Sequence, residues 1–154
     1  MATLPSDNQP LRERLIGTWI LSSWTRLVDG VEEPGAFGAD ALGQLSYSSN
    51  GYMSAHLMRR GRRRFATDDV IGSSDPVERA AAYDGYQSYC GRYEVDEAGS
   101  LVLHRVAMSS NPNWTDSLQK RFVEFIGDRM KLTTPPLLRQ GKAGTAVLIW
   151  ERAN

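Results

Sequence analysis

The sequence is poor in the residues that disulfides, metal sites and nucleophilic catalysis most often use. It contains one cysteine, Cys90, and two histidines, His56 and His104. A single cysteine cannot form a disulfide within the chain, so a reducing compartment, the cytoplasm, is expected. Neither a His-x-x-x-His nor a Cys-x-x-Cys spacing occurs, and no phosphate-binding glycine loop or dinucleotide fingerprint is present. We therefore expect no bound metal and no cofactor.

The chain also lacks a charge imbalance and a long apolar run. Its 18 basic and 18 acidic residues cancel, so no net field recruits nucleic acid or a membrane surface. No window approaches the roughly 18 apolar residues of a membrane span. The one local excess is the arginine-rich segment 59–64, which lacks the interleaved aromatic residues of a nucleic-acid site. It is interpreted as a solvated loop paired with nearby aspartates, and neither nucleic acid nor membrane is expected as a partner.

What the sequence does contain is a series of short strands separated by turn residues. Period-two alternation with β-branched and aromatic residues predicts strands at about 17–28, 43–49, 52–59, 91–96, 101–108, 118–126, 129–134 and 144–152. Short turns between them, such as Asn50-Gly51, imply antiparallel pairing of neighbours. Eight such strands close most simply into a barrel without free edges. We predict an all-β fold, a single antiparallel up-and-down β-barrel of about eight strands over residues 11–154, preceded by a loose tail at 1–10.

Two short helical segments are expected beside the strands. Leu11 and Leu15 are spaced for one amphipathic turn that leads into the first strand. The segment 74–78 has the pattern of a helix start, with a capping Ser or Asp followed by proline and an acid. It predicts an inserted helix from Pro76 to about Tyr89, although Gly85 weakens its second half.

Several motifs resemble a known family. Gly17-Thr18-Trp19 matches the Gly-x-Trp signature of lipocalins, in which an arginine at the end of the last strand packs over the tryptophan; Arg152 occupies that place. The segments LIGTW, GYMSAHLMR, RFATDD, GRYEVDEAG, NPNW, LTTPP and LIWER resemble the bacterial and fungal lipocalin-like domain proteins over about residues 11–152. The resemblance implies a barrel with a cavity. Some relatives belong to natural-product pathways, in which small barrels act as isomerases or cyclases.

Three residues are candidates for proton transfer. His104 alternates onto one face with valines and a methionine, so it is expected to be buried, in a structural or a catalytic role. His56 lies on a strand whose inward face the pattern leaves open. Glu151 shares a face with apolar residues, where a charge needs a partner or a wetted cavity, and it could act as a base with a raised pKa.

A second set of residues is expected to contact a ligand. The tyrosines among them recur at spacings of three or four along the predicted helix and into the next strand, and their alternative role is to pack that helix onto the barrel. Arg121 could bind a carboxylate or an enolate, or pair with another charge in the lumen. The full set is Met108, Arg121, Tyr86, Tyr89, Tyr93, Trp114 and Phe65.

These residues favour two functions. The first is binding of an apolar, partly oxygenated small molecule in the lumen of the barrel, by a monomer or homodimer. The alternative is a cofactor-free isomerase, cyclase or dehydratase that acts on a natural-product-like substrate through His or Glu proton transfer. A barrel filled by its own side chains, serving as an interaction module, would exclude both.

Overall fold

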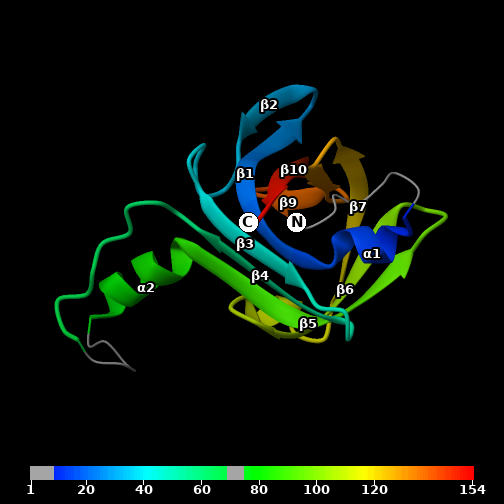
Figure 1. The fold of residues 1–154 in the computed structure, drawn as a ribbon. Coiled ribbons are helices and arrows are strands. Elements are labelled where there is room, and N and C mark those ends of the chain that lie inside the picture. The colour runs from blue at the N-terminus through cyan, green and yellow to red at the C-terminus, as the bar shows by residue number, and fades with distance from the viewer. Residues whose placement is uncertain (1–8, 69–74) are drawn as a thin grey trace.

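A computed structural model describes residues 9–68 and 75–154 and shows a closed antiparallel β-barrel (Figure 1). Its elements, in chain order, are α1 (Leu11–Leu15), β1 (Gly17–Val28), β2 (Val31–Pro34), β3 (Leu42–Tyr47), β4 (Tyr52–Met58), α2 (Pro76–Asp84), β5 (Tyr86–Asp96), β6 (Leu101–Ser109), the 3-10 turn η1 (Pro112–Trp114), β7 (Leu118–Ile126), β8 (Arg129–Thr133), β9 (Leu137–Arg139) and β10 (Lys142–Arg152).

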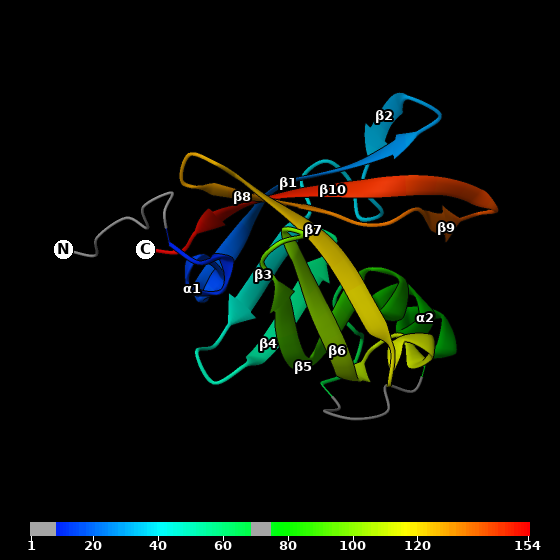
Figure 2. The same cartoon turned by 90° about the vertical axis from the view of Figure 1, so that its right-hand side faces the viewer.

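Eight strands close the barrel in the order β1-β3-β4-β5-β6-β7-β8-β10, and β10 returns to pair with β1. All of these pairings are antiparallel, and the predicted up-and-down barrel is confirmed. The short strands β2 and β9 were not predicted. β2 pairs with the last residues of β1, and β9 pairs with the first residues of β10. They extend the sheet at the end of the barrel opposite α1 (Figure 2).

The inserted helix α2 is shorter than predicted. It ends at Asp84 instead of about Tyr89, and the chain enters β5 at Tyr86. Its start is as expected, because the Asp75 side chain accepts a hydrogen bond from the backbone of Val77 at 2.8 Å. None of its residues is buried, and it projects away from the barrel (Figure 1). With Gly85 at its end and no buried face to hold it, the helix gives way to sheet pairing with β4.

A tryptophan–arginine contact closes the α1 end of the barrel. Trp19 is 1% exposed, and its Nε1 donates to the Leu15 carbonyl at 2.8 Å. The Arg152 guanidinium lies 4.2 Å from the centroid of the Trp19 ring and donates to the carbonyls of Ile16 and Arg14, both at 2.7 Å. The predicted contact between Trp19 and Arg152 is confirmed. It ties the last strand to the segment that precedes the first.

The two ends of the barrel therefore differ. Figure 2 shows α1 and the C-terminus at one end, and β9 and α2 toward the other. Helices across the described ranges are all too short or too polar to cross a membrane.

Candidate functional site

A cavity of about 250 Å³ lies within the barrel. Most of its lining is apolar, with a few polar side chains among aromatic and aliphatic ones: Trp24, Arg26, Ala36, Leu45, Ala55, Leu57, Gln87, Tyr89, His104, Trp114, Arg121, Leu132, Thr134, Leu137, Leu138, Arg139, Gly144, Ala146, Leu148 and Trp150. Leu138 on β9 is 79% exposed, so the cavity opens to solvent at the β9 end. The third possibility, a barrel filled by its own side chains, does not fit this cavity.

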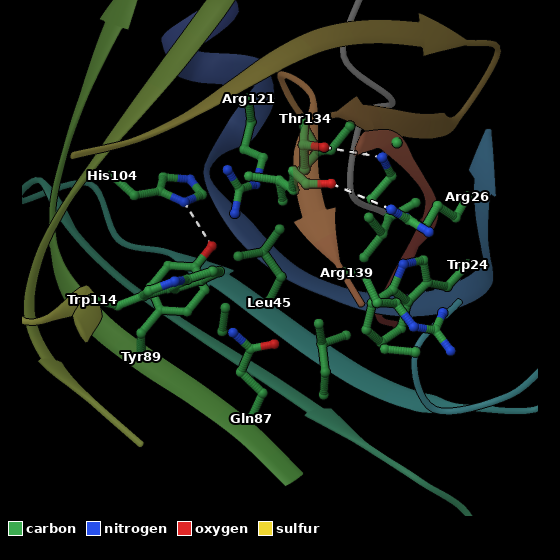
Figure 3. A pocket seen from close by; sticks show the side chains of 18 of the residues that line it. Trp24, Arg26, Leu45, Gln87, Tyr89, His104, Trp114, Arg121, Thr134 and Arg139 are labelled. Atoms are coloured by element: carbon green, nitrogen blue, oxygen red, sulfur yellow. Dashed lines mark hydrogen bonds between the residues drawn. The ribbon is translucent and has the colours of Figure 1, made fainter. Parts of the chain in front are cut away.

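Three of the polar side chains gather on one side of the cavity. Figure 3 shows His104, Tyr89 and Arg121 near one another, across the cavity from Trp24, Arg26 and Arg139. His104 comes from β6, Tyr89 from β5 and Arg121 from β7, three strands that are neighbours in the sheet. His104 and Arg121 fall on the inward faces of their strands, because Val102 and Val106 on β6 and Val123 on β7, two positions away, are buried in the core. Tyr89 is itself buried and lines the cavity from β5.

His104 is buried between two tyrosines. Its Nε2 lies 2.7 Å from the Tyr47 hydroxyl, and its Nδ1 lies 2.9 Å from the Tyr89 hydroxyl. Burial, reinforced by the positive charge of Arg121, holds the pKa of His104 well below its ordinary value. The imidazole is therefore neutral at physiological pH, with one nitrogen that donates and one that accepts.

The need to satisfy every buried donor decides which way the hydrogen bonds run from Tyr47 through His104 to Tyr89. Tyr47 is 2% exposed, and among the described residues its hydroxyl has His104 as its one hydrogen-bond partner. If His104 donated to Tyr47, the buried Tyr47 proton would have no acceptor, which is costly. Tyr47 therefore donates to Nε2, and Nδ1–H donates to Tyr89. This arrangement leaves the Tyr89 hydroxyl proton free to donate to a group in the cavity.

Burial raises the pKa values of both tyrosines above the ordinary value. Burial is the largest cause for both residues. The positive charge of Arg121 partly offsets it by lowering the pKa of Tyr89. Both hydroxyls therefore stay protonated near neutral pH, and Tyr89 serves the cavity as a hydrogen-bond donor.

Arg121 and Trp114 complete this side of the cavity. Arg121 is 7% exposed, and its Nη1 donates to the carbonyl of Lys120 at 2.7 Å. Its guanidinium lies 6.0 Å from the Trp114 ring, which in turn packs edge-on against Tyr89 at 5.4 Å between centroids. The Trp114 ring, the Tyr89 hydroxyl and the Arg121 guanidinium thus lie together on this side of the cavity.

Four of the predicted site residues line the cavity: His104, Arg121, Tyr89 and Trp114. The remaining tyrosines lie elsewhere. Tyr93 is buried toward the closed end, where its hydroxyl donates to the Ser48 carbonyl at 2.9 Å. Tyr86 lies outside the cavity, with its hydroxyl 2.6 Å from Nδ1 of His56. Phe65 is in the loop before α2 and is 41% exposed.

His56 and Glu151 both lie on the outer face of the barrel. This decides the orientation of His56, which the sequence left open, and corrects the prediction that the two residues act in proton transfer at the lumen. In β4 the inward residues are Ala55 and Leu57, which line the cavity on either side of His56. In β10 the inward residues include Leu148 and Trp150, which line the cavity, so Glu151 points outward. Its carboxylate pairs with Arg129 at 2.9 Å. Neither group can move a proton within the cavity.

Met108 also departs from its predicted place, because β6 contains a β-bulge. Gly91 pairs with Val106 whereas Cys90 pairs with Met108, so Ala107 is an extra residue that reverses the alternation beyond it. Met108 is consequently 66% exposed on the outer surface.

Sequence reasoning missed several cavity residues, including Trp24, Arg26, Gln87 and Trp150. Gln87 falls within the helix predicted from the sequence, whereas it lies in β5. Trp150 lies on the face of its strand opposite Glu151, and alternation alone could have paired it with Leu148 as a lumen residue. The buried Nε1 of Trp150 has no hydrogen-bond partner among the described residues.

The described part of the chain has no cluster of three or more His, Cys, Asp or Glu side chains able to hold a metal ion.

Comparison with known proteins identifies the family of the chain. The model of the lipocalin-like domain family matches residues 16–153, and the chain belongs to this family. It is 35% identical over 107 residues to the 4'-hydroxy-3'-methoxypropiophenone carrier protein ppsC of Aspergillus oryzae, a match that covers 65% of this chain and 96% of that protein. A crystal structure of a lipocalin-like protein from Bacteroides uniformis aligns over 91% of this chain and 99% of its own, with a TM-score of 0.46 and 13% identity.

Proposed function

We propose that the protein binds a small, largely apolar molecule that carries oxygen atoms, inside the barrel. The observation that carries this proposal is the open-ended cavity of about 250 Å³, whose apolar walls converge on Tyr89 and Arg121. Apolar walls with a few placed polar groups are the usual composition of a small-molecule site, in which the walls supply affinity and the polar groups set orientation.

The relative from Aspergillus oryzae suggests the chemical class. Its name describes a carrier of an aromatic ketone that also bears a phenol hydroxyl and a methoxy group. A flat aromatic ring suits the walls formed by Trp24, Trp114 and Trp150. The oxygen atoms of such a molecule suit the Tyr89 hydroxyl and the Arg121 guanidinium. An aromatic ketone or a related phenol is therefore the proposed ligand.

The enzyme alternative lacks a supporting observation of this kind. Of the three proton-transfer candidates, His104 alone lies at the cavity, and both of its ring nitrogens are engaged by tyrosines. Its lowered pKa also makes it a weak base. Binding and release without conversion is the function that this arrangement supports best.

A titration with 4'-hydroxy-3'-methoxypropiophenone tests the proposal. Binding should quench the fluorescence of the cavity tryptophans with one-to-one stoichiometry, and native mass spectrometry should detect the complex with an unchanged ligand mass. Ala146→Phe, which places a ring in the cavity, should weaken binding at least about tenfold. Tyr52→Phe on the outer surface is the matched control and should bind as the wild type does.

Two results would refute the proposal. One is the absence of saturable binding by this ketone and by any co-purified small molecule. The other is equal binding by the Ala146→Phe variant, which would place the ligand outside the barrel.

A further inference from the structure

The cavity is lined by cations without a matching anion. Arg26, Arg121 and Arg139 contribute to its walls, whereas no aspartate or glutamate does among the described residues. This contrasts with the outer surface, where Arg105 pairs with Glu94 at 2.6 Å and Lys131 pairs with Glu124 at 2.9 Å. The lumen is therefore locally positive, although the chain as a whole has no net charge.

The three cavity arginines are not equivalent. Arg26 has Glu33 at 3.8 Å and donates to the carbonyls of Leu137 and Lys142. Arg139 is exposed at the mouth, where water solvates it. Arg121 lies deepest, and its guanidinium interacts with a backbone carbonyl, with the Trp114 ring and with the Tyr89 hydroxyl, none of which carries a negative charge.

Arg121 consequently lacks a counter-charge. No carboxylate of the described residues lies within ion-pair distance of its guanidinium. A buried charge without an opposite charge is costly, and sites of this kind are stabilised when a ligand supplies that charge. A guanidinium also presents several N–H donors in a plane that matches the oxygens of an organic anion.

Tyr89 adds a second donor at the same point. Its hydroxyl proton is free for the cavity, because its oxygen accepts from His104. Arg121 lies close enough to influence the ionisation of both Tyr89 and His104. A hydroxyl and a guanidinium that converge in an apolar cavity have the donor arrangement that stabilises an oxyanion.

We propose that the ligand is bound as an aromatic oxyanion, the conjugate base of a phenol, an enol or a carboxylic acid, with its charged oxygen held by Arg121 and the Tyr89 hydroxyl. This inference rests on the proposed function and specifies the ionisation state of its ligand. Arg26 and Arg139 on the far side and at the mouth add a field that draws an anion inward.

The side chains that face this point are three arginines and two groups whose pKa values are shifted away from neutral pH. From β5 and β6 these are Tyr89, whose pKa is raised, and His104, whose pKa is lowered. From β1, β7 and β9 they are the guanidinium groups of Arg26, Arg121 and Arg139. Between about pH 6 and pH 9, any pH dependence of affinity therefore belongs to the ligand.

The experiment uses 4'-hydroxy-3'-methoxypropiophenone, whose phenol absorbs at longer wavelength once ionised. Its absorbance is followed against pH, free and in the presence of saturating protein. The expected result is a pKa at least one unit lower in the complex, which corresponds to about tenfold tighter binding of the phenolate than of the neutral phenol. The 4'-O-methyl ether, which cannot ionise, should bind at least about tenfold more weakly at the pH where the free phenol is ionised.

Arg121→Met tests the role of the guanidinium. It should abolish the lowering of the ligand pKa, and it should weaken binding of the phenolate by a much larger factor than binding of the neutral methyl ether. Lys120→Met is the matched control, since it removes the same charge one residue away on the outer face, and it should bind as the wild type does. A third ligand, 4-methoxybenzoate, tests which kind of oxyanion the site prefers. If it binds more tightly than the phenolate, the site is assigned to carboxylic acids.

Equal binding of the ether and the phenol, together with an unshifted ligand pKa in the wild type, would overturn the oxyanion proposal and leave the proposed function standing. Absence of binding by all three ligands would overturn both. The wild-type measurements decide the question even if the Arg121→Met variant does not fold.

Discussion

Three residues at the closed end of the barrel depend on one another. Gly17 has φ +132°, and a Cβ at that position would lie 2.6 Å from Nη1 of Arg152. Glycine at this position allows a backbone conformation that residues with a side chain disfavour. It also leaves room for the Arg152 guanidinium, which stacks on Trp19. The Gly-x-Trp motif and its distant arginine are one structural unit.

Removal of either large side chain should destabilise the barrel. Trp19→Ala leaves a cavity in the core, and Arg152→Ala removes the stacking together with two hydrogen bonds to carbonyls. Each should lower the free energy of unfolding by about 2 to 4 kcal/mol in urea denaturation. Ligand affinity of the folded protein should be unchanged, and Tyr52→Ala on the surface is the control. A loss below about 0.5 kcal/mol would contradict this role.

His104 should make stability depend on pH. Its folded pKa is depressed, so below its ordinary value of 6.5 the unfolded chain takes up a proton that the folded chain does not. The stabilisation present above that value is therefore lost as pH falls, by up to about 1.4 kcal/mol per pH unit. Urea denaturation at several values between about pH 6.5 and pH 5 measures this slope. His104→Gln should reduce it by that amount, whereas His56→Gln should retain it.

Arg121 should cost stability when no ligand is bound. Replacement by methionine removes a buried charge that lacks a carboxylate partner and keeps much of the side-chain volume. In the ligand-free protein, Arg121→Met should raise the free energy of unfolding by about 1 kcal/mol. Thermal and urea denaturation measure the change, with Lys120→Met as the control. A substantial loss of stability would mean that the guanidinium is compensated within the protein.

At the scale of elements, the β5–β6 pair contains a bulge that depends on a glycine. A Cβ at Gly91 would lie 1.9 Å from the Arg105 carbonyl oxygen and 2.9 Å from the Ala107 backbone nitrogen. The strands approach closely because β6 accommodates one extra residue at this point.

Gly91→Ala should therefore disrupt the pairing of these strands. We expect a loss of about 1 to 3 kcal/mol in the free energy of unfolding, because the backbone has to shift to relieve the overlap. Gly85→Ala, at the end of α2, is the matched control: its Cβ would meet side-chain atoms of Arg62 at an ordinary 3.4 Å. Equal stability of the two variants would contradict the constraint at the bulge.

For the whole molecule, ligand binding should add directly to barrel stability. A ligand that binds the folded state at 100 times its Kd contributes about 2.7 kcal/mol. For a domain of this size we expect Tm to rise by roughly 5 to 10 °C. Differential scanning fluorimetry with 4'-hydroxy-3'-methoxypropiophenone measures the shift. Ala146→Phe, checked by circular dichroism for folding, should show little of it.

Much of the site could be anticipated once the strands were placed. His104 and Arg121 are polar residues within alternating apolar faces, and a polar side chain facing a core requires partners or a cavity. Tyr89 belongs to a different element from the one its sequence spacing predicts: its spacing from other tyrosines fits a helix, whereas the residue pairs with Ala55 in the sheet. Contact with β4 outweighed helix propensity there.

The sequence by itself determined the eight strands, the turns between them and the contact that closes the barrel, because alternation and turn chemistry are local properties. Tertiary structure alone decided which face of each strand looks inward. Period-two alternation defines two faces and assigns neither to the lumen, as His56 and Glu151 demonstrate. A single extra residue, Ala107, then reversed the faces beyond it and moved Met108 to the surface. Register and closure, which join residues far apart in the chain, therefore select the side chains that meet in the cavity.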